Sequence, residues 1–476
     1  MTPEDPPAAA SPGRARWCCL RLGDGVRGRH ISVYYFGAFM TLGVAVGCST
    51  LQPFLMTSLL GLGAAEQGAV GAAAKSLGEA AAALLAGGAG LLSDRLGRRA
   101  VYACSLLLAA LGLGLLPLSR GLATFYALTA VSFAGTGAAA AVMAAIPGDY
   151  VLCPDRGKAN GLLAMANGLG AVCVGMVSGR LPGLAASLRP FAANRAQGIF
   201  AYGALAVAAA ATALTLGCGL AGRGVQRGGA AGAGALDALR AGLRLARGDR
   251  ALVLACLAAA AARSDGQIAF FFSQWCVSAS LRAAAAAAGL SPDAPLPPEL
   301  REAAVQRGLA HSTQCVGLVG LAGLLAGAVW GRLADSMDRA ATLSVALLAA
   351  AVAYAALALC PDPFGARALV VALLVGLCQT GVVVSSQAFV QERAPAEVRG
   401  LILGVFGLCG GVGQIVSVFA GGQLFAHWAF QGPFVWMCGV NLLVFCAGLV
   451  LVPLHRRGRP PATGSGVLLD GCGLRP

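Results

Sequence analysis

The sequence predicts an all-α integral membrane protein whose twelve transmembrane helices form two pseudo-symmetric six-helix bundles. Three observations predict this fold. Of the 476 residues, 58% are apolar and 11% are charged, and the mean hydropathy is +0.75, values that do not describe a water-soluble domain. Twelve apolar segments are long enough to cross a hydrocarbon core of about 30 Å as helices. Two motifs also recur in tandem, as is typical of transporters built from repeats.

The predicted spans divide into six on each side of a central loop. This loop contains the run LDALRAGLRLA, which predicts an amphipathic helix at the membrane surface. A second long connection, over 280–308, is expected on the opposite side of the membrane. The predicted spans cover residues 33–60, 68–92, 100–118, 122–146, 159–180, 197–220, 251–279, 309–333, 340–360, 367–391, 400–425 and 433–454.

These spans predict five regions in the chain. An N-terminal bundle (31–220) and a C-terminal bundle (251–455) are joined by a cytoplasmic loop (221–250), and tails precede and follow them (1–30 and 456–476). Most Lys and Arg residues lie in the tails, the central loop and the short loops on the same side. By the positive-inside rule, both termini are therefore expected in the cytoplasm. The sequence leaves open whether the plasma membrane or an organelle membrane holds the protein.

The charged and cysteine residues exclude several classes of function. The net charge is +14, but basic residues lie in short clusters between apolar segments, which does not indicate nucleic-acid binding. Most of the 16 cysteines fall inside spans and are expected to pack as small residues. Cys18 and Cys19, just before the first span, are either S-palmitoylated or unmodified thiols. No motif indicates an enzyme, a metal site or a cofactor.

A short basic loop occurs twice, each time between two predicted spans. It reads GLLSDRLGRR over 90–99 and GRLADSMDR over 331–339, and the acids Asp94 and Asp335 are 241 residues apart. Its first glycine permits close helix approach at the membrane surface. An acid just past a helix end can accept hydrogen bonds from free amides at a neighbouring helix N-terminus. The alternative is a positive-inside anchor, which explains the arginines but not the acid between two glycines.

A second motif recurs with nearly the same offset. It reads DYVLCPDRGKANG in the first half and ERAPAEVRGLILG in the second half. An acid, Asp149 or Glu392, is followed seven residues later by Arg-Gly, at Arg156 or Arg399. The acids are expected at the cytoplasmic ends of the fourth and tenth helices. They are either the acidic side of a gate or ordinary loop ion pairs.

These motifs resemble the major facilitator superfamily of transporters in its twelve-helix form, over about residues 31–455. The first basic loop matches the family signature between helices 2 and 3 in full, and the second matches the equivalent loop in part. The resemblance implies contacts that hold the cytoplasmic side closed and release during the transport cycle. The residues concerned are Gly90, Asp94, Arg95, Gly97, Arg98 and Arg99, then Asp335 and Arg339 with Asp338 in place of a glycine, and Asp149, Arg156, Glu392 and Arg399.

The resemblance also implies a substrate cavity between the halves, lined mainly by helices 1, 4, 7 and 10. Segments that mark sugar porters are missing, and so is the proline of the helix-5 motif of proton-drug antiporters. Neither substrate class is therefore assigned.

Ionisable residues inside the seventh span are candidates for the substrate site, because each is costly unless paired or hydrated. Arg263 and Asp265 point about 200° apart on a regular helix, so they do not neutralise each other directly. Gly266 permits an unwound turn that would change this arrangement. Arg263 shares a helix face with Gln267 and Gln274 and is suited to an anionic substrate group. The alternative is a structural pairing of Arg263 with Asp265 or with another helix.

The second span contains Lys75 and Glu79, which are spaced to pair on one helix face. A carboxyl group in the membrane interior can take and release a proton during a transport cycle, so Glu79 and Asp265 are candidate proton carriers. A static Lys75–Glu79 pair is the alternative. Gln52 and Gln379 either bind a substrate or only join helices.

The sequence predicts secondary active or facilitative transport of a small organic solute by alternating access. A functional monomer is expected, with protons as one candidate coupling ion. The first span lacks the acid of proton-coupled sugar porters, so facilitated diffusion is also open. A non-transporting receptor or scaffold with the transporter fold is the alternative from another class. Substrate, coupling ion and the choice among uniport, symport and antiport are left open.

Overall fold

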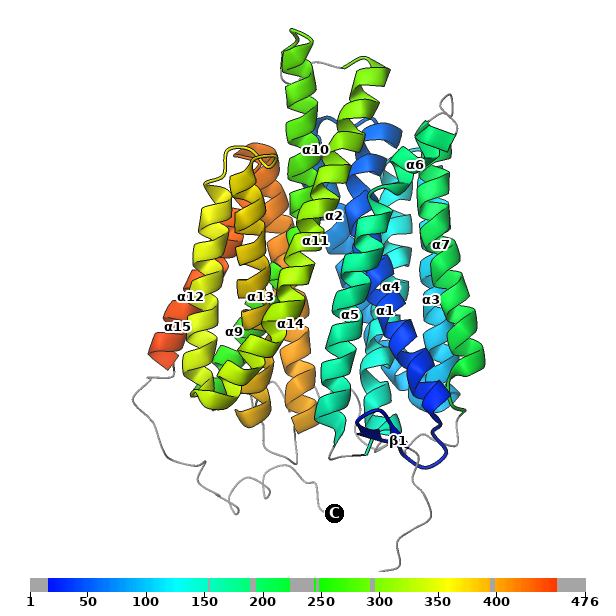
Figure 1. Ribbon diagram of the computed structural model, residues 1–476, viewed down its shortest axis with the longest axis vertical. Coiled ribbons are helices and arrows are strands. Elements are labelled where there is room, and N and C mark those ends of the chain that lie inside the picture. Colours follow the sequence, from blue (N-terminus) through cyan, green and yellow to red (C-terminus); the bar gives the residue numbers. More distant parts are fainter. Residues whose placement is uncertain are drawn as a thin grey trace, which may run out of the picture.

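The protein, seen in a computed structural model, is almost entirely helical (Figure 1). Twelve helical segments among the described residues are long and apolar enough to cross a membrane, which confirms the predicted number. A bilayer core offers backbone groups no water to bond, so helices that satisfy these groups internally are favoured. The described residues are 16–152, 155–188, 194–222, 244, 248–291, 296–393 and 399–451.

Each half of the chain is a series of helices joined by short connections. The first half contains α1 (Gly28–Phe54), α2 (Ala64–Leu96), α3 (Arg98–Leu115), α4 (Leu122–Tyr150), α5 (Arg156–Ser178), α6 (Leu181–Leu188) and α7 (Asn194–Gly219). The second contains α9 (Arg250–Asp265), α10 (Ile268–Ala287), α11 (Pro298–Ser336), α12 (Arg339–Ala358), α13 (Ala366–Arg393), α14 (Arg399–His427) and α15 (Gly432–Leu451). A short π-helix, η1 (Leu55–Leu59), extends α1, and a short 3₁₀-helix, η2 (Leu116–Leu118), extends α3.

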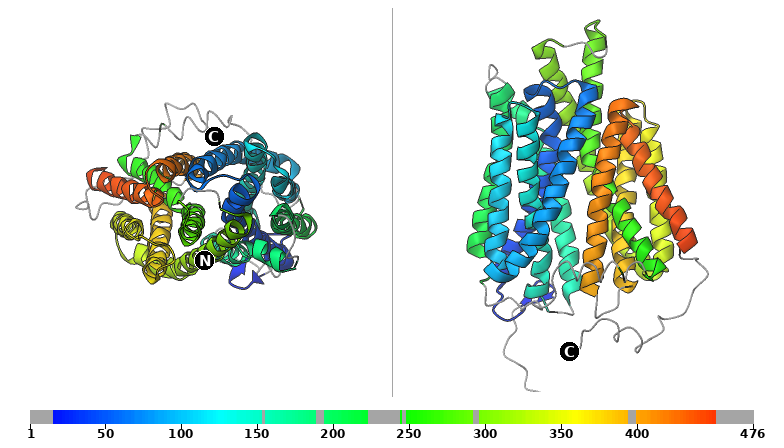
Figure 2. Two further views of the ribbon diagram at one scale, coloured as in Figure 1. Left: turned by 90° about the horizontal axis from the view of Figure 1, so that it is seen from above. Right: turned by 180° about the vertical axis from the view of Figure 1, so that it is seen from behind.

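The two halves lie side by side and repeat the same packing (Figure 2). In the first half α2 packs on α4 and α3 on α7, whereas in the second α11 packs on α13 and α12 on α15. Counted as spans, these are the second on the fourth and the third on the sixth in each half. The repeated pairing confirms two pseudo-symmetric six-helix bundles.

The seventh span is broken near its middle, as the sequence allowed. Helix α9 ends at Asp265, α10 begins at Ile268, and the two residues between them form a turn in which the Gln267 amide donates to the Ser264 carbonyl at 3.0 Å. Non-helical backbone at membrane depth is tolerated where protein buries it or where it lines a cavity.

The predicted long connection over 280–308 is mostly helical instead. Helix α10 continues to Ala287 and α11 begins at Pro298, so both project beyond the rest of the bundle (Figure 1). An alanine run has high helix propensity, and proline suits the first turn of a helix. These local preferences extend the two helices. The predicted amphipathic helix of the central loop falls largely outside the described residues.

Part of the predicted N-terminal tail is folded. Strands β1 (Arg16–Trp17) and β2 (Leu20–Arg21) form an antiparallel hairpin. Its turn contains the exposed Cys18 and Cys19, and Cys18 has a positive φ of 50°. The chain then pairs with the end of α4, because the Gly23 amide donates to the Tyr150 carbonyl at 2.9 Å. The hairpin therefore sits against the first half.

Candidate substrate site and gates

The two halves contact each other mainly toward one end of the bundle. We call the end at which α1 begins the near end and the opposite one the far end. Toward the far end α2 packs on α14 and α5 on α11. A Cβ atom added at Gly422 would collide with Ala72, and one added at Gly179 would collide with Thr313. Small residues thus let the helices of opposite halves approach closely.

Polar contacts also join the halves at the far end. Of the side chains that make these contacts, the sequence analysis named only Gln274, as a candidate for the substrate site. Four hydrogen bonds cross the interface among the described residues: Gln274 Nε2 to the Gln67 carbonyl at 3.1 Å, Arg301 Nη2 to the Leu62 carbonyl at 3.2 Å, Gln197 Nε2 to Glu302 Oε1, and Ser76 Oγ to the Ile415 carbonyl at 3.4 Å.

Toward the near end the same four helices diverge. A Cβ atom added at Gly90, Gly161, Gly331 or Gly407 would meet nothing within 4 Å. The close approach expected at Gly90 is therefore not made in this conformation. From this we infer that the halves diverge toward the near end, and we call the space between them there the cleft.

Lys75 of α2 lies where the cleft ends. Its side chain is buried, and its ammonium nitrogen donates to Ser49 Oγ of α1 at 3.3 Å. The same nitrogen lies 4.6 Å from the ring centroid of Phe270 in α10, a cation–π contact across the two halves. One hydroxyl group and one ring leave the other ammonium donors without acceptors among the described residues, so the site favours an anion.

Glu79 and Arg263 complete a charged cluster that spans both halves. The charged neighbours of Glu79 are Lys75, one turn earlier on α2, and Arg263 of α9, and its polar neighbour is Gln414 of α14. No ion pair within 4.0 Å joins Lys75 to Glu79 in the part of the chain that the structure describes, so a tight static pair is not formed. Arg263 is exposed, and its side chain packs near Gly410. Two cations thus face one acid.

The helix break separates the polar stripe that was expected on the seventh span. Arg263 is exposed, whereas Gln267 and Gln274 are buried. Gln52 Nε2 donates to the Gly71 carbonyl at 3.5 Å, and Gln379 Oε1 lies 3.3 Å from a tyrosine hydroxyl. The amide groups of Gln52 and Gln274 therefore join helices in this conformation, and Arg263 alone of the stripe is exposed.

Asp265 does not line the cleft. Its side chain is fully buried in the second half, where Oδ1 accepts a hydrogen bond of 2.8 Å from Asn441 Nδ2 of α15. Tyr354 of α12 contacts its backbone carbonyl at 3.3 Å. A regular helix would have placed Asp265 and Arg263 on different faces, and the broken helix keeps that separation.

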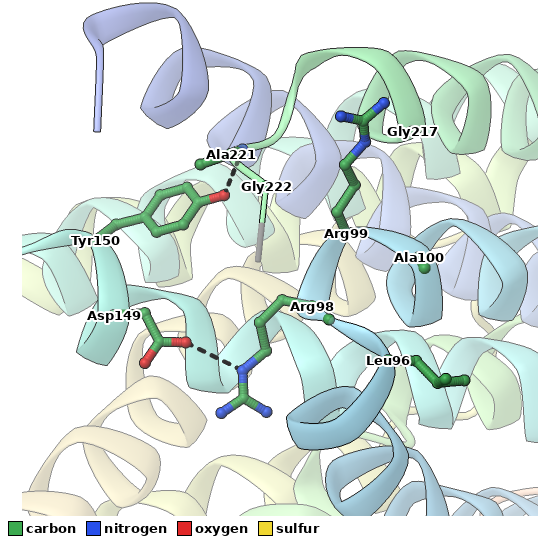
Figure 3. A pocket seen from close by; sticks show the side chains of 10 residues that line it. Leu96, Arg98, Arg99, Ala100, Asp149, Tyr150, Gly217, Ala221 and Gly222 are labelled. Atoms are coloured by element: carbon green, nitrogen blue, oxygen red, sulfur yellow. Dashed lines mark hydrogen bonds and ion pairs between the residues drawn. The ribbon is translucent and has the colours of Figure 1, made fainter. Parts of the chain in front are cut away.

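The repeated motifs form equivalent ion pairs at the near end. Arg98 Nε at the start of α3 lies 3.1 Å from Asp149 Oδ2 at the end of α4 (Figure 3). Arg339 Nε at the start of α12 lies 3.3 Å from Glu392 Oε2 at the end of α13. The first pair is largely buried, with side chains 16% and 10% exposed, and the second is 35% and 46% exposed. The duplicated motifs therefore form equivalent ion pairs, and the pair in the first half is less exposed to solvent than the pair in the second half.

The other predicted gate residues are placed only in part. Asp94 lies in the last turn of α2 rather than past its end, and Arg156 and Arg399 open α5 and α14 as expected. The side chains of these residues and of Asp335 lie outside the described residues. Their gate contacts stay predictions.

The glycine of the first loop and its replacement in the second have a structural reason. Gly97 precedes α3 with φ 101°, a conformation that favours glycine. Asp338 at the equivalent place has φ −57°, and its carboxylate accepts a hydrogen bond from the Ala341 amide at 3.0 Å. The second loop thus replaces a left-handed glycine with an acidic helix cap.

A cavity of about 450 Å³ lies beside the Arg98–Asp149 pair at the near end. It is lined by the start of α3 and the ends of α4 and α7, and the exposed Arg99 projects along its wall (Figure 3). Across it the Tyr150 hydroxyl accepts a hydrogen bond of 2.8 Å from the Ala221 amide. In the first half, therefore, a cavity lies next to the Arg98–Asp149 ion pair.

We expect Asp149→Asn to impair transport more than Glu392→Gln. The shielded Arg98–Asp149 pair is worth about 1–3 kcal/mol, and the exposed Arg339–Glu392 pair about 0–1 kcal/mol. Each pair lies within one half and is formed while the near end is open, so we expect it to hold its loop in position for closure. Loss of the stronger pair should therefore lower uptake more than loss of the weaker one. Uptake into vesicles, normalised to inserted protein, measures both variants. Equal activities of the two would contradict the ranking.

Two further ion pairs lie where the N-terminal hairpin meets the start of α5. Arg21 Nε lies 2.8 Å from Asp155 Oδ2, and Lys158 Nζ lies 3.1 Å from Asp155 Oδ1. The hydrogen bonds from the Arg21 side chain and amide lower the pKa of the Asp155 carboxyl below its usual range, and the same contact raises the pKa of Arg21. The hairpin is therefore held by a carboxylate in its charged form.

Docking of the hairpin is expected to weaken in acid. Because the pKa of Asp155 is lower in the folded protein, its stabilisation is fully present above about pH 4 and is lost as the pH falls toward the folded value. Asp155→Asn should remove this dependence and raise the rate of tryptic cleavage at Arg16 and Arg21 at neutral pH. Equal cleavage rates in the mutant and the wild type would exclude this fastening role.

The fold and the charged cluster together define a class of protein. Two equivalent helical halves, with a cleft between them that is closed at one end, are typical of multi-pass membrane transporters that alternate access. The family model of the Major Facilitator Superfamily matches residues 32–417, with a second match over 266–469. The chain belongs to the major facilitator superfamily, as its motifs indicated.

Individual proteins resemble the chain over most or part of its length. MamZ, a magnetosome protein of Magnetospirillum gryphiswaldense, is 27% identical over 425 residues that cover 85% of this chain and 60% of MamZ. The chain thus spans about 60% of the length of that relative. The staphyloferrin B transporter of Staphylococcus aureus is 34% identical over 125 residues, 26% of this chain and 29% of that protein.

Solved structures share the fold. A crystal structure of a mutant of the nucleoside transporter NupG superimposes with a TM-score of 0.66 at 14% identity, covering 89% of this chain and 99% of that chain. At this identity the likeness concerns the arrangement of helices.

Proposed function

We propose that the protein carries a small organic anion across a membrane by alternating access. The observation that carries this proposal is the cluster of Lys75, Glu79 and Arg263 where the cleft between the halves ends. Two cations against one acid leave an excess positive charge, with Lys75 buried and Arg263 exposed. Such a site favours carboxylate or phosphate groups, and the arginine fork suits their geometry.

Both halves supply the cluster, which suits an alternating mechanism. Lys75 and Glu79 belong to α2, whereas Arg263 belongs to α9. A substrate anion between them would contact both halves and bias their relative position by its different affinity for each arrangement. In this proposal the near end is cytoplasmic, as the positive-inside bias predicts, and the conformation described faces inward. A single chain contains both halves of the site, so we propose a functional monomer.

Flux measurements test the proposal against a non-transporting receptor or scaffold. A thermal-shift screen of the detergent-solubilised protein against carboxylates, phosphate esters, amino acids, sugars and nucleosides identifies ligands, because a bound ligand raises the apparent stability. Ligands that shift the transition are then offered, labelled, to vesicles containing the purified protein. Accumulation or exchange of an anion supports the proposal. Binding without flux for every ligand would favour the scaffold, and flux of uncharged solutes alone would remove the anion specificity.

A further inference from the structure

Asp265 is a buried acid without a basic partner in the part of the chain that the structure describes. Its side chain is 0% exposed, Oδ1 accepts one hydrogen bond from Asn441, and Oδ2 has no hydrogen-bond partner among the described residues. No ion pair of the described residues reaches it. Glu79, by contrast, has two cationic neighbours.

The groups that face Asp265 are neutral polar side chains. From α15 comes the amide of Asn441, and from α12 the hydroxyl of Tyr354, which lies 3.3 Å from the Asp265 carbonyl oxygen. From α13 come the thiol of Cys378 and, through Tyr354, the amide of Gln379. Helix α14 directs no titratable side chain to it in the part of the chain described. Tyr354 and Cys378 are thus the titratable neighbours.

This environment suits a neutral acid better than a carboxylate. An ion removed from water needs an opposite charge or several donors. Asp265 has only neutral donors near its carboxyl group among the described residues, the amide of Asn441 and the hydroxyl of Tyr354. A protonated carboxyl group needs a single acceptor for its O–H. The Oδ1 atom of Asn441 also has no partner and belongs to the side chain that already contacts Asp265, so an acceptor is at hand.

The break in the seventh span offers a route to water. Asp265 is the last residue of α9, and the next residue, Gly266, is exposed. Only Gly266 and Gln267 separate α9 from α10. Short non-helical segments absorb backbone changes when domains move. A change of backbone conformation at this turn is the movement that would expose the Asp265 carboxyl group to the cleft.

We propose that Asp265 is the proton-binding site of this transporter, protonated in the conformation described and deprotonated when the turn at Gly266 opens. The O–H bond at the carboxyl group breaks, the proton passes to water in the cleft, and a carboxylate remains. The role of Asp265 in coupling rests on the proposed transport function, whereas its protonation state is measured on the purified protein without transport.

Infrared difference spectroscopy of the purified protein tests the protonation state. Between neutral and alkaline pH, the wild type should lose a carbonyl-stretch band of a protonated carboxylic acid and gain carboxylate bands. Asp265→Asn, which is nearly isosteric, should abolish that change, and Asp265→Glu should retain it at a shifted frequency. Glu79→Gln is the matched control and should keep the band. A wild-type band that persists in Asp265→Asn, or that disappears in Glu79→Gln instead, would overturn the proposal.

The same variants separate this proposal from the proposed function. If the band belongs to Asp265 but no anion is transported, the transport proposal fails and the proton site stands. If an anion is transported and a pH gradient accelerates uptake equally in wild type and Asp265→Asn, the coupling role of Asp265 fails alone. We expect the gradient to accelerate wild-type uptake at least tenfold more than uptake by Asp265→Asn.

Discussion

Arg263→Ala is expected to weaken the binding of an anionic substrate strongly. Arg263 is the exposed cation on the second-half side of the cleft, and no ion pair of the described residues occupies it. A charge-assisted hydrogen bond to a substrate anion is worth about 1.5–3 kcal/mol, so its loss weakens affinity about 10- to 100-fold. Lysine at this position should recover part of the affinity, because the positive charge remains. It should not recover all of it, because lysine cannot form the bidentate hydrogen bonds of the guanidinium group.

Thermal-shift titration with the anion found in the ligand screen measures this effect. Arg367→Ala is a suitable control, since Arg367 is an exposed arginine in the first turn of α13. It should leave affinity unchanged. Unchanged affinity in Arg263→Ala as well would assign Arg263 a structural role and move the binding site elsewhere.

Gly422→Leu is expected to stop transport by holding the far end apart. Position 422 has no room for a side chain, because even a Cβ atom would collide with Ala72 of the opposite half. Overpacking of this kind costs about 1–3 kcal/mol or more. Here that cost falls only on arrangements in which the far end is closed, so the halves would favour another position.

The control for this variant is Gly439→Leu in α15. A Cβ atom at Gly439 meets nothing within 4 Å, so leucine there should preserve both uptake and thermal stability. Uptake into vesicles and thermal unfolding are measured for both variants. Wild-type uptake by Gly422→Leu would show that the far-end contact between α2 and α14 is dispensable for the transport cycle.

Much of the fold could be predicted because it depends on local chemistry. Apolar segments of sufficient length must become helices in a bilayer, so their number and approximate bounds follow from composition. The duplicated motifs likewise predicted equivalent places for the two basic loops and for Asp149 and Glu392, whereas the pairing of these acids with Arg98 and Arg339 came from the structure. Boundaries were less certain where helix propensity continued past the apolar run, as at Ala287 and Pro298.

The site was only partly predictable, because it depends on which side chains opposite halves bring together. Sequence spacing indicated a pairing of Lys75 with Glu79. In the structure the Lys75 ammonium group instead donates a hydrogen bond to Ser49 and lies over the ring of Phe270. Asp265 was expected in the cavity, yet the helix break and Asn441 hold it in the closed core. Neither outcome can be read from one segment, since each depends on a helix distant in the chain.

The sequence by itself determined a membrane-embedded, duplicated transporter with its basic loops on one side, because transfer of apolar helices into lipid and the spacing of charged residues are properties of short segments. Only the tertiary structure decided that the far end is closed, that Lys75 and Arg263 share one cluster, and that Asp265 is left without a cation. The physical reason is that these features arise from contacts between helices of opposite halves or distant spans. Their energy depends on packing distance and burial, which no single segment specifies.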